Sequence, residues 1–192
     1  MIGYFQAKLN EYFCKKNNSV QSSKKIFLIG FMGSGKTTIG KKLATKLKLP
    51  FIDLDEAIVR QEKKSIVEIF ECFGEDYFRI QEKKMLAHII KSNEAFVLAT
   101  GGGTPCFFDN MDVMNQTGIT FYLNYTPAFL TSRLLQATQK RPLLKNVLKD
   151  NMDNFIASLL KEREIFYKKS QFTISKINPN PSDFLTFFKP TD

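Results

Sequence analysis

The sequence predicts an α/β fold in which three layers, α/β/α, contain a central, mainly five-stranded parallel sheet. Two observations support this prediction. Short apolar runs alternate with stretches of helical periodicity, and a glycine-rich segment joins the first apolar run to the first helical stretch. Strands that alternate with helices form parallel sheets covered on both faces. At 192 residues, we expect one domain with a single core.

The pattern of apolar residues predicts each element in turn. Strands are expected at residues 26–29, 51–55, 96–100, 119–124 and 172–175. Helices are expected from 36 to just before Pro50, from 56, from about 65, from 76 to 92, from 127 through 133, from about 152 to 169 and from 182. Ser65 and Glu68 match a capping box, and Thr126 with Pro127 is typical of a helix start.

Two segments lie outside this regular pattern. Residues 1–24 form an N-terminal extension whose apolar spacing over 2–13 predicts a short amphipathic helix, followed by a polar linker. A packing or partner-facing extension and a targeting segment are both alternatives, although the extension lacks arginine and a secretory cleavage pattern. Residues 136–150 lack periodicity and are rich in Lys, Gln and Asn, which predicts a mobile lid within a domain at 25–192.

Composition narrows the class of protein. The net charge of +9 favours anionic ligands, but the basic residues are scattered, so a surface around a phosphate site fits better than nucleic-acid binding. Three cysteines without metal spacing indicate a reducing, cytoplasmic compartment. The single histidine, His88, falls within a predicted helix and is interpreted as structural. No apolar run approaches the length of a membrane span.

Gly30–Thr37 (GFMGSGKT) matches the phosphate-binding P-loop, and it lies between a strand and a helix as that motif requires. Glycines allow backbone N–H groups to surround phosphate oxygens, and the helix N-terminus adds its positive end. Lys36 can reach the outer phosphates, and the Thr37 hydroxyl can bind Mg²⁺. A glycine-rich turn without a ligand is the alternative, which the complete motif and its flanks disfavour. The chain is expected to bind a nucleoside triphosphate.

Other candidate residues lie at the ends of predicted strands, where ligands bind in parallel sheets. Asp53 and Asp55 end a strand expected beside the P-loop strand, and they could divide the binding of Mg²⁺ and the orientation of an attacking hydroxyl. Alternatively, Asp55 simply caps the helix at 56. The triple glycine Gly101–Gly103 follows another strand and permits close approach of the backbone to a ligand, or forms only a loop.

Four arginines are candidates for anion binding. Arg79 and Glu82 lie at i and i+3, so the acid can hold a guanidinium that binds a carboxylate, unless the two form an ordinary surface ion pair. Arg141 in the lid could close over the transferred phosphoryl group. Arg163, followed by Tyr167, could be a second carboxylate clamp or a solvated charge, and Arg133 could stack on adenine or extend into solvent.

Together these segments resemble shikimate kinase, a family of the nucleoside monophosphate kinase-like P-loop group. The resemblance spans about residues 26–175, and the segments follow the order of the family. The matching segments are Gly30–Thr37, Asp53–Asp55, Gly74–Glu75, Phe78–Arg79 with Glu82, Gly101–Gly103, Arg141–Leu144, and Arg163 with Tyr167. The sequence departs from the family in its extension, in about one extra residue before Arg141 and in residues 106–115, which carry no sharp motif.

The resemblance implies a fold of the P-loop NTPase type with a mobile lid, and a cytoplasmic, monomeric enzyme. Its activity would be ATP-dependent phosphorylation of the 3-hydroxyl of shikimate, giving shikimate 3-phosphate and ADP on the route to chorismate and aromatic amino acids. ATP and Mg²⁺ would be required, without nucleic-acid or membrane partners. The substrate-binding region would lie at about residues 55–90.

The resemblance also assigns roles to matching residues. Asp55, Lys36 and Arg141 would be catalytic, with Asp55 assisting deprotonation of the 3-hydroxyl. Thr37 would bind Mg²⁺, and Asp53 would hold it through water. Nucleotide would be bound by Gly33, Ser34, Gly35, Lys36, Thr37, Thr38, Arg133 and Arg141. Shikimate would be bound by Asp55, Phe70, Phe78, Arg79, Gly101, Gly102, Gly103 and Arg163. Of these, Arg79 and Arg163 would bind its carboxylate.

Other functions remain open at this stage. Gluconate also carries a carboxylate and hydroxyls, so a gluconate kinase on the same scaffold is the first alternative, and a nucleotide kinase would need a base pocket that the sequence does not identify. A P-loop protein without turnover and a basic nucleic-acid-associated ATPase belong to other classes. Lys36, Asp55 and both clamp arginines argue against lost turnover, and the absence of a basic block with interleaved aromatics argues against nucleic acid.

Overall fold

The computed structural model describes residues 25–136, 144 and 147–188. The predicted N-terminal helix and most of the predicted lid, including Arg141, lie outside the described residues. Among the described helices, none is long and apolar enough to cross a membrane.

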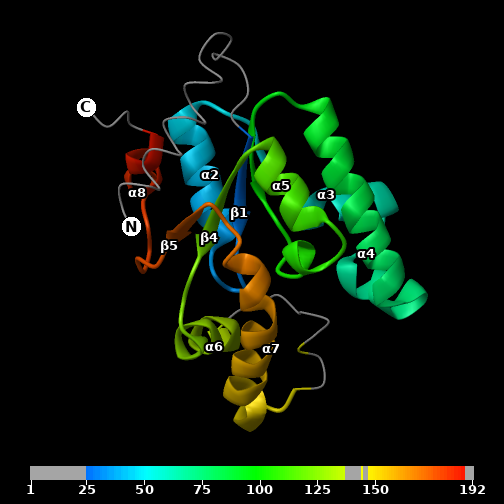
Figure 1. Ribbon diagram of the computed structural model, residues 1–192. Coiled ribbons are helices and arrows are strands. Elements are labelled where there is room, and N and C mark those ends of the chain that lie inside the picture. The colour runs from blue at the N-terminus through cyan, green and yellow to red at the C-terminus, as the bar shows by residue number, and fades with distance from the viewer. Residues whose placement is uncertain (1–24, 137–143, 145–146, 189–192) are drawn as a thin grey trace.

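Five parallel strands form one sheet in the order β2-β3-β1-β4-β5 (Figure 1), which confirms the predicted central layer. The strands are β1 (Lys25–Ile29), β2 (Phe51–Asp53), β3 (Phe96–Ala99), β4 (Ile119–Leu123) and β5 (Phe172–Ile174). The central strands β1 and β3 are almost wholly apolar and buried, as expected of strands covered on both faces.

Helices cover both faces of the sheet (Figure 1). Helices α2 (Lys36–Leu47) and α8 (Pro181–Leu185) lie on one face, and α4 (Ile66–Ser92) and α5 (Asn110–Thr117) lie on the other. The remaining elements are α3 (Leu54–Glu62), α6 (Pro127–Gln136), α7 (Met152–Tyr167) and the short 3-10 helices η1 (Thr104–Cys106), η3 (Lys149–Asn151) and η4 (Thr186–Phe188). The three predicted layers are therefore present.

The predicted place of the two acids was wrong in two details. Strand β3 lies between β2 and β1, so Asp53 and Asp55 do not end a strand adjacent to the P-loop strand. The strand predicted to reach residue 55 ends at Asp53, because the Asp53 side chain accepts hydrogen bonds from the backbone of Asp55 and Glu56. Asp53 thereby caps α3, which begins at Leu54 rather than 56, and the cap is not Asp55.

The two helices expected from about 65 and from 76 to 92 are present within α4, where they meet at Gly74, whose φ of 80° and ψ of 173° are not helical. The predicted Ser65–Glu68 capping box is present at the start of α4. Helix α5 was not predicted, because its buried face offers only two apolar side chains, Met111 and Met114.

Candidate active site

The first six residues of the P-loop, 30–35, lie between β1 and α2, and its Lys36 and Thr37 begin α2. Gly33 and Gly35 have φ angles of 79° and 91°, which side chains with a Cβ rarely adopt. Gly35 is the N-cap of α2 and has no side chain that could cap the helix. The N-terminal amides of α2 therefore face the loop without a side-chain cap. A chain of backbone donors at a helix N-terminus is an anion-binding arrangement. Ser34 and Lys36 are buried there, and Thr38 lies in the same first turn of α2.

Lys36 lies folded over this loop. Its Nζ donates to the carbonyl oxygens of Gly30 at 2.8 Å and Phe31 at 2.9 Å, and lies 3.4 Å from Ser34 Oγ. The ammonium is therefore held at the centre of the loop, next to the amides that would surround a phosphate.

Thr37 and Asp53 come together at the mouth of the loop. Thr37 Oγ1 donates to Asp53 Oδ2 at 2.8 Å, while Asp53 Oδ1 accepts the amides of Asp55 and Glu56. Hydroxyl and carboxylate oxygens are the ligands that Mg²⁺ prefers, and Mg²⁺ typically takes only one or two protein ligands beside phosphate oxygens and water. The described residues contain no group of three or more His, Cys, Asp or Glu placed to hold a metal. The Thr37–Asp53 pair thus fits a Mg²⁺ ion shared with a nucleotide.

Asp55 lies in the first turn of α3, close to the buried carboxylate of Glu82. A Cβ on Gly101 would lie 2.9 Å from Asp55 Oδ1 and 2.7 Å from Glu82 Oε1, so both carboxylates border this glycine. Glu82 is completely buried, and burial raises its pKa, against the lowering effects of the Arg79 charge and the Thr104 hydrogen bond. The negative charge of Asp55 adds to the rise in the pKa of Glu82.

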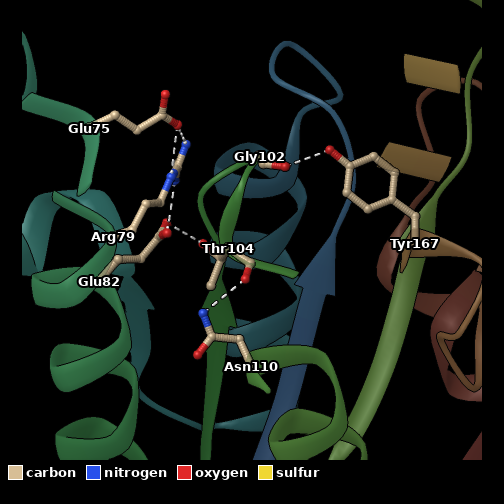
Figure 2. Close-up of polar contacts among 7 residues, drawn as sticks. All are labelled: Glu75, Arg79, Glu82, Gly102, Thr104, Asn110 and Tyr167. Carbon is tan, nitrogen blue, oxygen red and sulfur yellow. Dashed lines mark hydrogen bonds and ion pairs between the residues drawn. The ribbon is translucent and has the colours of Figure 1, made fainter. Parts of the chain in front are cut away.

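Arg79 is held by two carboxylates from its own helix (Figure 2). Its Nη1 lies 2.9 Å from Glu82 Oε2, and its Nη2 and Nε lie 2.8 Å and 3.1 Å from Glu75 Oε1. The guanidinium lies over the rings of Phe78 and Phe107, 5.0 Å and 4.2 Å from their centroids. With Arg79 only 4% exposed, the surface ion pair considered from the sequence is excluded. The predicted Arg79–Glu82 pair is present as a buried one.

Arg163 and Tyr167, one turn apart on α7, contact the triple glycine. The Tyr167 hydroxyl donates to the Gly102 carbonyl at 2.5 Å (Figure 2), and Arg163 Nη1 lies 3.6 Å from where a Cβ of Gly102 would be. Arg163 is 7% exposed and its guanidinium lies 5.9 Å from the ring centroid of Phe31, so it is not a solvated surface charge. Burial raises the pKa of Tyr167, which keeps its hydroxyl protonated as a donor.

Close packing helps to explain why glycine occupies positions 101–103. A Cβ on Gly103 would lie 2.6 Å from both Nη1 and Nη2 of Arg79, and the corresponding positions on Gly101 and Gly102 lie against Asp55, Glu82 and Arg163. A side chain on Gly101 or Gly103 would displace a charged group, whereas a Cβ on Gly102 would lie 3.2 Å from the backbone nitrogen of Met32, so close packing favours glycine most strongly at 101 and 103.

Phe70 and Phe78 pack against each other beside Arg79, with ring centroids 4.9 Å apart. Phe78 is buried, and Phe70 is half-buried. They lie on α4 on the two sides of the Gly74 break, within residues 55–90, where the sequence predicts the substrate-binding region.

A pocket of about 160 Å³ opens beside the P-loop and contains Arg133 from α6. Besides Ser34 and Gly35, it is lined by Thr38, Ile39, Lys42, Arg133, Asn178 and Pro179. The sequence interpretation named Thr38 and Arg133 but missed Asn178 and Pro179. These two follow β5 at its carboxyl end, and the turn-forming Asn-Pro pair at that position was the available signal.

The fold and the site define a P-loop phosphotransferase, and comparison with known proteins gives the family. The profile described as shikimate kinase matches residues 32–188. A shikimate kinase of Azobacteroides pseudotrichonymphae is 48% identical over 159 residues, 82% of this chain and 94% of that protein. The chain therefore belongs to the shikimate kinase family, and it phosphorylates shikimate with ATP and Mg²⁺.

Solved structures agree with this assignment. Shikimate kinase from Bacteroides thetaiotaomicron matches with a TM-score of 0.80 and 39% identity, covering 86% of this chain and 98% of that one. Shikimate kinase from Acinetobacter baumannii, solved in complex with shikimate, matches with a TM-score of 0.77 and 33% identity, covering 86% and 90%. A gluconokinase from Sinorhizobium meliloti, with a TM-score of 0.55 and 15% identity, shares the fold alone. The gluconate alternative is therefore less supported.

Proposed function

We propose that the chain transfers the γ-phosphoryl group of ATP to the 3-hydroxyl of shikimate, with Asp55 as the proton acceptor. The observation that carries this assignment is the position of Asp55, which borders Gly101 together with the Glu82–Arg79 pair and lies on the same helix turn that Asp53 caps beside Thr37. A carboxylate that lies between a carboxylate-binding arginine and a phosphate-binding loop is suited to take the proton of an acceptor hydroxyl.

The acceptor is held, in this proposal, by two buried arginines. Arg79 and Arg163 bind the shikimate carboxylate, and the backbone at Gly101–Gly103 contacts its hydroxyls. Phe70 and Phe78 form an apolar wall. A buried guanidinium fixed by carboxylates presents its remaining N–H donors in one orientation, which suits bidentate recognition of a planar carboxylate.

The reaction then follows from positioning. The 3-hydroxyl oxygen forms a bond to the γ-phosphorus, the bond from that phosphorus to the bridging oxygen breaks, the hydroxyl proton passes to Asp55, and ADP leaves. Lys36 and the P-loop amides of Gly33–Thr37 stabilise charge on the phosphates. Bound Mg²⁺ supplies further neutralisation of the β- and γ-phosphates. Thr37 and Asp53 hold the ion, and Thr38 and Arg133 contact the nucleotide.

The same proposal extends to parts of the chain outside this geometry. We assign Arg141 to a lid at about 136–150 that closes on the phosphates, and residues 25–192 to the kinase domain, with 1–24 as a separate extension. We further propose a cytoplasmic location, because the cysteines show no disulfide or metal spacing, and no nucleic-acid partner, because the basic residues are scattered. The resemblance to the family is the basis for proposing a monomer.

A coupled ADP-release assay tests the acceptor. Shikimate, gluconate, AMP and CMP are offered separately with Mg-ATP, and phosphorus NMR of the product identifies the hydroxyl that is modified. We expect rapid ADP release with shikimate alone and a product phosphorylated at the 3-position. Release on gluconate but not on shikimate, or phosphorylation of another hydroxyl, would overturn the proposal.

A further inference from the structure

Thr104 lies behind the acceptor site and has no role in the mechanism above. It is completely buried at the start of η1, directly after the triple glycine. Its hydroxyl donates to Glu82 Oε1 at 2.5 Å, and its carbonyl accepts a hydrogen bond from Asn110 Nδ2 at 3.0 Å (Figure 2). Asn110, at the start of α5, is itself 2% exposed. Asn110 thus holds the Thr104 carbonyl, while the Thr104 hydroxyl donates to Glu82.

Glu82 contacts both Thr104 and Arg79. One oxygen of the Glu82 carboxylate accepts the Thr104 hydroxyl, and the other accepts Arg79 Nη1 at 2.9 Å. Because both oxygens of a planar carboxylate turn together, the hydrogen bond at Oε1 sets the direction in which Oε2 faces Arg79. The second support of Arg79 is Glu75, whose side chain is 41% exposed, so Glu82 is the buried support.

The charges around Glu82 show why a hydrogen-bond donor matters there. Arg79 faces it from its own helix and Asp55 from α3, and the neutral thiol of Cys106 lies nearby on η1. Burial opposes the ionised form of Glu82 most strongly, and the charge of Asp55 adds to this effect. A hydroxyl that donates to the carboxylate favours the charged form, and its loss would leave a buried oxygen without that partner.

We propose that Thr104 is a positioning residue for acceptor recognition: Asn110 holds its backbone carbonyl, and its hydroxyl orients Glu82 so that Arg79 is presented to the carboxylate of the acceptor. This inference rests on the proposed role of Arg79. It predicts a defect in binding shikimate and not in binding ATP, although Thr104 need not touch either substrate.

The test compares Thr104→Val, which removes the hydroxyl but keeps the side-chain shape, with Thr104→Ser, which keeps the hydroxyl. For Thr104→Val we expect the KM for shikimate to rise about tenfold, because a small displacement of a positioning group is costly. The KM for ATP should change less than about twofold, and kcat should change less than the KM for shikimate. Thr104→Ser should stay close to the unsubstituted protein.

Thr117→Val is the matched control. It removes a hydroxyl that donates at 2.7 Å to Val113 O within α5, with no link to Glu82, and both KM values should stay unchanged. Thermal unfolding of each variant reports folding. If Thr104→Val does not fold, Thr104→Ala removes the same donor with less bulk and is measured in its place.

A double-mutant cycle decides whether Thr104 acts through Arg79. In the Arg79→Ala background, Thr104→Val should cause no further loss of kcat/KM for shikimate. An equal fold loss in both backgrounds, an equal rise in the KM for ATP, or a Thr104→Ser variant as weak as Thr104→Val would overturn the inference. The proposed function is judged separately by the unsubstituted protein and Arg79→Ala alone, since an acceptor other than shikimate or an unchanged KM in Arg79→Ala would refute it without any Thr104 variant.

Discussion

The nucleotide half and the acceptor half of the proposed site are built in different ways. The nucleotide half centres on one contiguous loop, in which backbone amides, glycines with positive φ angles and Lys36 meet at a helix start, and Asp53 and Arg133 join it from other elements. The acceptor half is assembled from α3, α4, η1 and α7, and its contacts run from one buried side chain to the next. A backbone cradle tolerates changes in side chains around it, whereas each member of a side-chain network is needed. Substitutions should therefore be more selective for one substrate in the acceptor half.

The largest effect is expected where the two halves meet, at Asp55. Asp55→Asn keeps the shape of the side chain but removes the proton acceptor, so kcat should fall by about 10²–10⁴-fold while the affinity for ATP stays within about threefold. Coupled ADP release and calorimetric titration with ATP measure the two quantities.

Folding is the control for this variant. Thermal unfolding of Asp55→Asn is measured beside its activity, so that a loss of turnover is interpreted only in folded protein. Near-normal turnover in a folded Asp55→Asn protein would remove Asp55 from the reaction and leave the acceptor half without a base.

The second prediction concerns Asp53, which serves both halves by capping α3 and pairing with Thr37. Asp53→Asn keeps an oxygen that can cap the helix but loses the charge. The Mg²⁺ concentration that gives half-maximal activity should rise about tenfold, with little change in unfolding temperature. Titration of activity with Mg²⁺ at fixed ATP measures this, and an unchanged requirement would exclude Asp53 from holding the ion.

The two halves also differed in how far sequence could predict them. The P-loop was recognised in full, because its function depends on residues that are neighbours in the chain. The network around Arg79 was only half recognised: its partner Glu82 lies on the same helical turn, but Thr104, which donates to Glu82, is 22 residues from Glu82 and meets it only through packing of η1 against α4. Asn178 and Pro179 were missed although the Asn-Pro pair indicates a turn after β5, because no local pattern shows that this turn lies against α2.

The order of the strands in the sheet likewise could not be predicted from local sequence patterns. The alternation of strands and helices predicted five parallel strands, but the insertion of β3 between β2 and β1 depends on which crossover each helix makes. Asp53 nevertheless reaches Thr37 because α2 begins at the same edge of the sheet where β2 ends.

A third prediction tests the pocket of the nucleotide half. Arg133→Ala removes a cation from that pocket, so the KM for ATP should rise severalfold, by about three- to tenfold, with the KM for shikimate unchanged. Arg60→Ala, on the exposed side of α3, is the control and should change neither constant. A rise in the KM for shikimate in Arg133→Ala would show that the pocket serves the acceptor instead.

The smallest effect concerns Cys106, which lies in the acceptor half and has no proposed role in the reaction. Burial raises the pKa of its thiol to about 11, although the charges of Arg163 and Arg79 act in the opposite direction. The thiol is therefore protonated near neutral pH, and its alkylation by iodoacetamide should be slow and accelerate as pH rises. Exposed Cys72 is the internal control in peptide mass spectrometry. Cys106 labelling as fast as Cys72 at neutral pH would contradict the buried acceptor half.

The central claim, that acceptor and nucleotide are recognised by separate groups of residues, is tested most directly by the two specificity constants of Arg79→Ala. Removal of the buried guanidinium should lower kcat/KM for shikimate by about 10²–10³-fold, while the KM for ATP changes less than about threefold. Thermal unfolding is recorded alongside, because the variant leaves Glu82 buried without its cation. Equal losses for shikimate and ATP in a folded protein would contradict the division of the site.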